Sequence, residues 1–292
     1  MARPRPETTR FAPSPSGWLH LGHAYSACMG WDAARASGGR FLLRIDDLDR
    51  ERSRQDYDDA IFEDLTWLGL DWEPEIRRES HHLTDYQKAV DDLQEMGVAY
   101  PCFCSRREIR AEIARMGAAP HGPEGPHYPG TCRGLTKSEC EDRIAAGATP
   151  AIRLNTERAL SQTGALTWFD RDAGTIDARP DQFGDPVIGR KEGPGAYHIA
   201  VVIDDAAQDV TLVTRGQDLF EASHLHRLLQ ELLQLPVPEY QHHRLILDSN
   251  GKRLAKRSDA AAIRTLRADG MSPGEVWALL GLSRPEDACQ QV

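Results

Sequence analysis

The chain has 292 residues, 40% of them hydrophobic, which is enough to bury an ordinary core in one large α/β domain or two modest ones. Its first ten residues are polar and no apolar run approaches the ~20 residues that span a bilayer. We therefore expect no membrane contact and a cytoplasmic location. The formal net charge is −10, so a nucleic-acid partner would have to meet a local basic surface.

The chain begins with a βαβ pattern. We predict a strand at residues 8–12, a turn at 17–23 that opens a helix to about residue 37, and a second strand at 40–45. This order is typical of a parallel α/β unit. Two helices with polar faces follow, near residues 53–68 and 84–96.

The middle of the chain breaks this rhythm. Residues 117–134 carry Gly or Pro at almost every second or third position, which predicts a loop. The later features, in chain order, are apolar runs at 151–154 and 197–203, a long helix at about 223–233, a strand at 245–247, a basic loop at 252–257 and two short helices.

Three of the six cysteines flank the predicted loop. Cys102 and Cys104 precede it and Cys132 lies near its end. This spacing is not the even framework of a small disulfide-bonded secreted protein, so metal binding is favoured over disulfides. The middle third is therefore predicted to be an insertion held together at its base, with buried free thiols as the alternative.

The motif that carries most chemistry is His20-Leu21-Gly22-His23, which follows a strand and a Pro/Ser/Gly turn. A glycine at the start of the helix lets a nucleotide approach the backbone, and unpaired N–H groups at a helix N-terminus bind phosphate. Two imidazoles three residues apart would face the same phosphates and stabilise the charge that develops during adenylation. The alternative is a turn with two surface histidines.

The basic loop at residues 252–257 is the second signal. A lysine in such a loop neutralises the β and γ phosphates as pyrophosphate leaves; alone, the loop is equally consistent with a solvated surface. The two motifs together predict an ATP-using enzyme that activates a carboxylic acid as its adenylate.

These motifs resemble the HIGH and KMSKS signatures of class I aminoacyl-tRNA synthetases. Residues 10–15, 43–49 and 197–205 further resemble the glutamyl-tRNA synthetase catalytic domain. Those enzymes continue into a helical anticodon-binding domain, whereas 35 residues follow Arg257 here. That short end, with the Cys-x-Cys and Tyr-x-x-x-Cys elements, is similar to the glutamyl-Q tRNA(Asp) synthetase family.

The resemblance implies an α/β fold: a Rossmann-like class I catalytic core with an inserted zinc-bearing subdomain and no anticodon-binding domain. The implied segments are residues 8–100 (first half of the catalytic domain), 101–195 (inserted zinc-bearing, acceptor-like subdomain), 196–250 (second half) and 251–292 (KMSKS-like loop and short C-terminal helices).

It also implies a function. The family activates L-glutamate with ATP without needing tRNA and attaches it to the queuosine base at the wobble position of tRNA(Asp), as an AMP-forming ligase. The implied partners are ATP with Mg²⁺, L-glutamate and queuosine-modified tRNA(Asp), with one structural Zn²⁺. A monomer is expected.

The resemblance carries over to particular residues. It assigns catalysis to His20, His23 and Lys256, ATP binding to these three with Gly22 and Arg253, glutamate binding to Arg10, Ser14, Asp46, Tyr197 and Arg215, and zinc to Cys102, Cys104, Tyr128 and Cys132. The chemistry suits these roles, since guanidinium groups pair with carboxylates and a carboxylate pairs with the substrate ammonium. Tyrosine is a rare zinc ligand, so His121 and His127 remain alternatives.

Two positions depart from the family pattern. The basic loop has Ala255 where the family has serine, which removes a hydroxyl near the phosphates, and Asp46 stands where related enzymes carry glutamate. The shorter side chain of Asp46 either weakens its pairing with the substrate ammonium or lets a water bridge the gap. Three other functions stay open: glutamyl-tRNA synthetase-type charging of a tRNA 3′ end, a small-molecule adenylyltransferase, and a non-catalytic zinc-bearing RNA-binding module.

Overall fold

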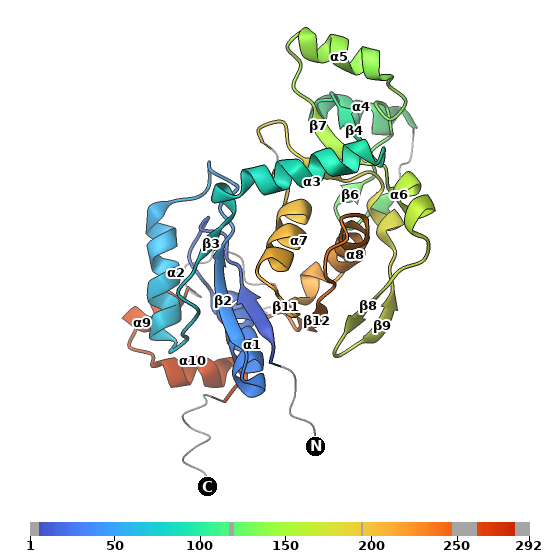
Figure 1. The fold of residues 1–292 in the computed structure, drawn as a ribbon. Coiled ribbons are helices and arrows are strands. Elements are labelled where there is room, and N and C mark those ends of the chain that lie inside the picture. Colours follow the sequence, from blue (N-terminus) through green and yellow to red (C-terminus); the bar gives the residue numbers. More distant parts are fainter. Residues whose placement is uncertain (1–5, 117–119, 194, 247–261, 284–292) are drawn as a thin grey trace. The chain divides into compact units, whose positions relative to one another are not determined.

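A computed structural model describes residues 6–116, 120–193, 195–246 and 262–283 (Figure 1). The chain forms two compact units, which are taken separately below. Unit 1 comprises residues 1–81, 210–218 and 238–292, and unit 2 comprises residues 82–209 and 219–237. The division into four segments implied by the family resemblance stays a prediction.

Unit 1 begins with a parallel sheet, as predicted. Strand β1 (Thr8–Phe11) pairs with β2 (Arg40–Ile45), and β2 pairs with the short β3 (Arg77–Arg78), all in parallel (Figure 1). Every residue of β1 is buried, as is every residue of β2 after Arg40. Strands buried on both faces are typical of parallel sheets in α/β proteins.

A second pair of parallel strands lies beside β1. Strand β11 (Leu212–Gly216) pairs with β12 (Glu239–His243). The Thr211 amide donates to the Thr8 carbonyl over 2.9 Å, and Arg10 Nη1 approaches the Thr214 carbonyl at 3.4 Å. Because these contacts advance in the same direction along both segments, β1 and β11 run parallel. The predicted α/β core with a parallel sheet is confirmed.

The predicted strand at residues 245–247 is wrong in its described part. Leu245 and Ile246 are not in a strand, and Leu247 lies outside the described residues. The strand is β12, whose five residues pair one by one with the five residues of β11. After Gly216 the chain turns into the 3-10 helix Gln217–Leu219, so β11 offers no further partner. Pairing, rather than local apolarity, sets the end of this strand.

Helix α1 (Leu21–Ser37) packs tightly on the sheet, and its predicted bounds are confirmed. At Gly30, a Cβ atom would stand 2.9 Å from Thr214 Oγ1, and the Gly30 carbonyl accepts a 2.7 Å hydrogen bond from Thr9 Oγ1. A residue without a side chain therefore lets α1 cross the sheet in contact with its backbone.

The other helices of unit 1 enclose the same core. They are α2 (Gln55–Trp67), α9 (Ile263–Ala268) and α10 (Pro273–Leu280), with the 3-10 helix Glu79–His81. Trp277 of α10 is 1% exposed, its Nε1 donates to the Leu68 carbonyl over 3.1 Å, and its ring contacts that of Trp31. The predicted helix near residues 53–68 and the two short C-terminal helices are confirmed.

Unit 2 has antiparallel strands. Its strands are β4 (Ala99–Cys102), β5 (His121–Gly122), β6 (Gly125–Pro126), β7 (Ala151–Leu154), β8 (Thr167–Asp170), β9 (Gly174–Asp177) and β10 (Val187–Gly189). Strand β7 lies between β4 and β10, β8 pairs with β9, and β5 pairs with β6. The short β5–β6 hairpin lies inside the predicted loop.

Helices complete unit 2. They are α3 (Leu83–Glu95), α4 (Arg106–Met116), α5 (Lys137–Ala145), α6 (Thr156–Thr163), α7 (Tyr197–Ala207) and α8 (Ala222–Leu232), with the 3-10 helix Pro180–Phe183. The helices predicted near residues 84–96 and 223–233 are confirmed as α3 and α8. Tyr86 of α3 donates to Asp204 of α7 over 2.8 Å, so a buried carboxylate there has a partner. None of the helices in the described residues combines the length and apolarity needed to cross a membrane.

Candidate active site and metal centre

His20 and His23 close the N-terminus of α1 with their own side chains. The Gly22 amide donates to His20 Nδ1 over 3.1 Å, and the His20 amide donates to His23 Nδ1 over 3.2 Å. The two rings are stacked with centroids 3.8 Å apart. Because each Nδ1 accepts a hydrogen, the neutral rings carry their proton on Nε2. The motif is therefore a pair of stacked imidazoles whose N–H groups are on Nε2.

Gly22 is also required by the packing within its own motif. A Cβ atom at this position would stand 3.0 Å from His20 Cε1 and 3.1 Å from His20 Nδ1. The glycine thus makes room for the imidazole of its own motif. The amides of Gly22 and His23 also already donate, to His20 Nδ1 and the His20 carbonyl respectively. The side chains, rather than these amides, present the donors.

The candidate glutamate residues of unit 1 come from the carboxyl ends of its parallel strands. Arg10 is on β1, Asp46 follows β2 and Arg215 is on β11. Ligands of open α/β sheets bind at this end of the strands. The Asp46 amide donates to the Pro13 carbonyl over 3.0 Å, which joins the loop containing Ser14 to the end of β2.

The two arginines are almost fully buried. Arg10 is 6% exposed and Arg215 is 5% exposed. Arg215 Nε donates to His242 Nε2 over 3.0 Å, and its guanidinium lies 5.2 Å from the centroid of the Tyr240 ring. These contacts with β12 orient the guanidinium, which raises its suitability for a fixed carboxylate.

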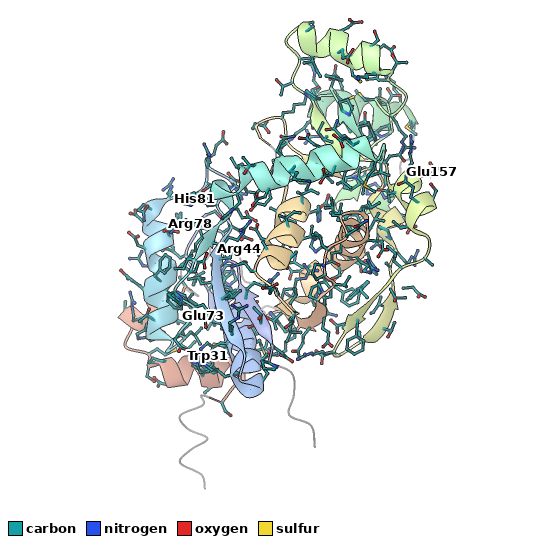
Figure 2. The ribbon with its side chains drawn as sticks, in the orientation of Figure 1. Trp31, Arg44, Glu73, Arg78, His81 and Glu157 are labelled. Carbon is teal, nitrogen blue, oxygen red and sulfur yellow. The ribbon has the colours of Figure 1, made fainter. Side chains whose placement is uncertain are left out.

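Arg44 was not among the predicted site residues. It is completely buried, and its Nε lies 3.0 Å from Asp46 Oδ1, whose side chain is 14% exposed (Figure 2). Alternate residues of a strand point to the same face, which brings Arg44 and Asp46 together. The signal in the sequence was an arginine between the apolar residues Leu43 and Ile45, two positions before an aspartate.

Of the remaining predicted site residues, one lies in unit 2 and two lie outside the described residues. Tyr197 is the first residue of α7 in unit 2, where its ring contacts His198 and His226. Arg253 and Lys256 lie outside the described residues. The chain returns to the histidine motif just after them: Ala262 forms a β-bridge with His20, and the Ile263 amide donates to the Leu19 carbonyl over 2.9 Å.

Three cysteines form a candidate metal centre in unit 2. The Sγ atoms of Cys102, Cys104 and Cys132 all lie within 4.8 Å of one another, and those of Cys104 and Cys132 are 3.5 Å apart. Tyr128 Oη lies 3.4 Å from Cys104 Sγ and accepts a 2.9 Å hydrogen bond from the Cys132 amide. Three thiols this close together fit a structural zinc site, which thiolates bind tightly.

The surroundings act differently on the thiols. Burial raises the pKa of Cys104 to about 11. At Cys132 burial also acts to raise the pKa, but hydrogen bonds from Tyr128 and from nearby groups outweigh it and lower the pKa. The Cys132 thiol is therefore easier to deprotonate than an ordinary cysteine, whereas the Cys104 thiol is harder to deprotonate.

Neither alternative histidine joins this cluster. His127 Nε2 is 2.8 Å from the Gln182 carbonyl, and His121 is exposed on the β5–β6 hairpin. Among the described residues, the group of His, Cys, Asp or Glu side chains close enough to hold a metal is the three cysteines. Tyr128 as fourth ligand stays a prediction.

The fold and these two sites agree with what the chain is similar to. Residues 7–284 match the model of the family described as tRNA synthetases class I (E and Q), catalytic domain. The chain belongs to this family and, within it, to the glutamyl-Q tRNA(Asp) synthetases. It is 47% identical over 279 residues to the glutamyl-Q tRNA(Asp) synthetase of Rhodobacter capsulatus, covering 94% of this chain and 99% of that relative. The resemblance found in the motifs is confirmed.

Longer enzymes match as well. The chain is 39% identical over 284 residues to the glutamate-tRNA ligase of Aquifex aeolicus, covering 96% of this chain and 58% of that one. The crystal structure of the glutamate-tRNA synthetase from Elizabethkingia anophelis has a TM-score of 0.73 and 27% identity, covering 91% of this chain and 54% of that one. The chain thus spans somewhat more than half the length of these two enzymes.

Proposed function

We propose that this chain activates L-glutamate as its adenylate and transfers it to the queuosine base of tRNA(Asp). The observation that carries the proposal is the position of Arg10, Asp46 and Arg215 at or just after the carboxyl ends of strands of one parallel unit, in the same unit as the stacked His20 and His23. Family membership supplies the reaction. We expect a monomer that acts in the cytoplasm, where ATP, glutamate and tRNA occur together.

The roles follow from the charges. The buried guanidiniums of Arg10 and Arg215 suit a substrate carboxylate, and Asp46, steadied by Arg44, suits the ammonium. Ser14 and Tyr197 would add hydrogen bonds to the same amino acid. The Nε2 hydrogens of His20 and His23 would bind phosphate oxygens of ATP near Gly22, and Arg253 and Lys256 would neutralise the outer phosphates.

The reaction has two steps. In the first, the α-carboxylate of glutamate attacks the α-phosphorus of ATP and pyrophosphate leaves. In the second, a hydroxyl of the queuosine cyclopentenediol attacks the carbonyl of the mixed anhydride, loses its proton and releases AMP. Both steps depend on positioning and on stabilising negative charge, which fixed donors do well in a site that excludes water.

Two metal ions accompany this proposal. Mg²⁺ would enter with the triphosphate and neutralise part of its charge. Zn²⁺ would be held by Cys102, Cys104, Cys132 and Tyr128, with a structural role, because a closed set of four protein ligands leaves no open position for substrate.

The first step is tested by glutamate-dependent exchange between ATP and pyrophosphate without tRNA. We expect exchange with L-glutamate and none with other amino acids or small acids, which distinguishes the chain from a small-molecule adenylyltransferase. Lys256→Ala should abolish exchange while the protein stays folded. A folded, zinc-loaded protein with no exchange would contradict the proposal and leave the RNA-binding alternative.

The second step is tested by locating labelled glutamate on tRNA. We expect label on the queuosine of tRNA(Asp). No label should appear when the tRNA has first been treated with periodate, which cleaves the cyclopentenediol. Label on the 3′ end would favour glutamyl-tRNA synthetase-type charging instead.

A further inference from the structure

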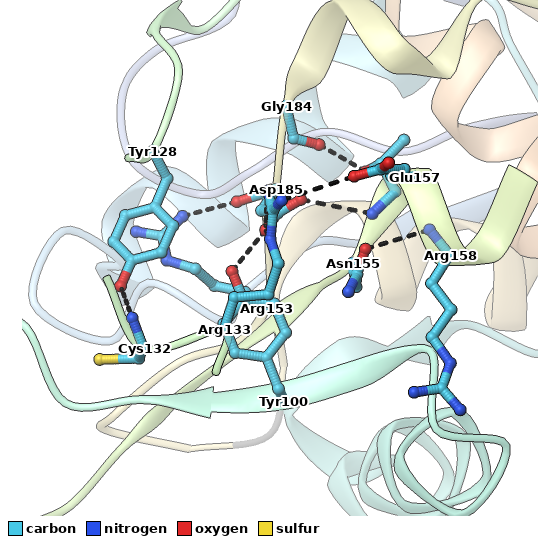
Figure 3. A network of polar contacts seen from close by, with 11 residues as sticks. Tyr100, Tyr128, Cys132, Arg133, Arg153, Asn155, Glu157, Arg158, Gly184 and Asp185 are labelled. Atoms are coloured by element: carbon cyan, nitrogen blue, oxygen red, sulfur yellow. Dashed lines mark hydrogen bonds and ion pairs between the residues drawn. The ribbon is translucent and has the colours of Figure 1, made fainter. Parts of the chain in front are cut away.

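A buried carboxylate lies close to the candidate metal centre, and none of the predicted roles uses it. Asp185, just before β10, is 2% exposed. Its Oδ2 accepts hydrogen bonds from Tyr100 Oη of β4 and, over 2.9 and 2.8 Å, from Nε and Nη2 of Arg133 (Figure 3). A buried charge is retained only where partners compensate for its lost hydration.

The first partner of Asp185, Arg133, is the chain neighbour of a candidate metal ligand, Cys132. Arg133 follows Cys132 in the chain, so fixing the Arg133 side chain restrains the peptide that carries Cys132. The loop that supplies Cys132 and Tyr128 has few apolar side chains of its own. The ion pair therefore ties this loop to the sheet of β4, β7 and β10.

The second partner is stacked on the phenol. Arg153 of β7 donates from Nη1 to the backbone carbonyl of Asp185 over 2.7 Å, and its guanidinium lies 4.0 Å from the centroid of the Tyr128 ring (Figure 3). The buried Nε of Arg153 has no hydrogen-bond partner in the described part of the chain. The carbonyl of Asp185 and the ring of Tyr128 are thus the contacts that orient this guanidinium.

We propose that Asp185, acting through Arg133 and Arg153, is the positioning residue of the metal centre. Its side chain fixes Cys132 through Arg133, and its carbonyl fixes the plane of Tyr128 through Arg153. Groups one shell out from a metal set the orientation of its ligands, and their loss typically weakens metal affinity by roughly 10- to 100-fold. The proposal rests on the metal site of the proposed function but not on glutamate activation.

Zinc affinity of the whole protein tests it, measured by competition with a chromophoric chelator in the absence of ATP, glutamate and tRNA. Asp185→Asn, Arg133→Lys and Arg153→Met should each weaken zinc binding by roughly 10- to 100-fold. Arg133→Lys keeps the charge but loses the rigid planar guanidinium, whose Nε and Nη2 both donate to Asp185. In the Co²⁺-substituted protein, Arg153→Met should shift the visible ligand-field bands, because Tyr128 changes its orientation.

Arg78→Lys is the matched control. Arg78 holds Asp58 of unit 1 with two hydrogen bonds of 2.9 and 2.7 Å, so this variant loses a comparable ion pair away from the cysteines. It should bind zinc like the unchanged protein. Wild-type affinity in both Arg133→Lys and Arg153→Met, or an equal loss in Arg78→Lys, overturns the proposal. If Asp185→Asn does not fold, the two arginine variants decide the question.

Discussion

The two histidines of the nucleotide motif are held by the backbone of their own turn. His20 caps helix α1, His23 lies in its first turn, and each ring accepts an amide hydrogen through Nδ1. The motif is thus a small ordered structure rather than a turn with two unattached surface histidines, which was the alternative interpretation of the sequence. Preorganised donors of this kind are where enzymes gain most of their electrostatic stabilisation.

Gly22→Ala tests this arrangement. The added methyl group would meet His20 Cε1 at 3.0 Å, so the imidazole must move. We expect glutamate-dependent exchange to fall on the order of 100-fold, because small displacements of catalytic groups are costly. The measurement is the rate of ATP–pyrophosphate exchange at saturating substrates.

Gly274→Ala is its control, since Gly274 also lies in the first turn of a helix and no atom stands within 4 Å of its added Cβ. That variant should keep full exchange activity. An equally active Gly22→Ala would mean that the position of the His20 ring is unimportant.

Among helices and strands, the local sequence predicts an element well when the apolar side chains of that element alone account for its burial. Residues 40–45 form a strand as predicted, because the apolar residues Phe41–Leu43 and Ile45 suit a strand buried on both faces. The run at 197–203 is equally apolar but belongs to helix α7, since helix and strand both satisfy full burial. Strand β12 was missed because its polar residues Glu239–His243 gain their structure by pairing with β11.

Helices α2 and α9 meet at an unfavourable carboxylate. Asp64 of α2 is fully buried, neither of its oxygens has a hydrogen-bond partner among the described residues, and Arg267 Nη1 of α9 stands 4.0 Å away. Burial raises the pKa of Asp64 from 3.8 to about 6, although Arg267 opposes the shift. The folded state therefore binds this proton more tightly than the unfolded state does.

The sign of the pH effect follows. Between about pH 4 and pH 6 the contribution of Asp64 lowers the free energy of unfolding as pH rises, and above pH 6 the cost is constant. Asp64→Asn should remove this dependence and raise the free energy of unfolding at pH 8 by up to about 3 kcal/mol. Denaturant titrations at pH 4 and pH 8 measure both effects.

Glu63→Gln provides the comparison on the same helix, because Glu63 also pairs with Arg267 but its side chain is 63% exposed. It should leave the pH dependence nearly unchanged. A pH profile that survives in Asp64→Asn would show that another group causes it.

At the scale of the whole molecule, the sequence predicts the family correctly, but it does not predict the residues that hold the candidate site residues in place. Asp46 follows from a motif, but Arg44, which holds it, follows only from the strand geometry. Asp185 has partners 52 and 85 residues away in the chain, Arg133 and Tyr100, so no local pattern could join them. Contacts of this range are decided by the packed fold and carry no fixed spacing.

Unit 1 also depends on its last described helix. Trp277→Ala should destabilise the protein by roughly 3 to 5 kcal/mol, because it leaves a cavity against Trp31 and removes the hydrogen bond to Leu68. Chemical denaturation followed by circular dichroism gives the change. Leu279→Ala, at a side chain 58% exposed on the same helix, should change stability by no more than about 0.5 kcal/mol. Equal effects of the two variants would contradict the packing described.

The bridge between His20 and Ala262 has a consequence for synthesis. Helix α1 can contact residues 262–280 only after more than two hundred further residues have left the ribosome. At common translation rates this is a delay of roughly 10 to 50 seconds. During that time the apolar face of α1 is without the partners supplied by α10. We expect the nascent chain to need chaperones over this interval, and the late arrival of α9 and α10 to be the event that lets unit 1 complete its fold.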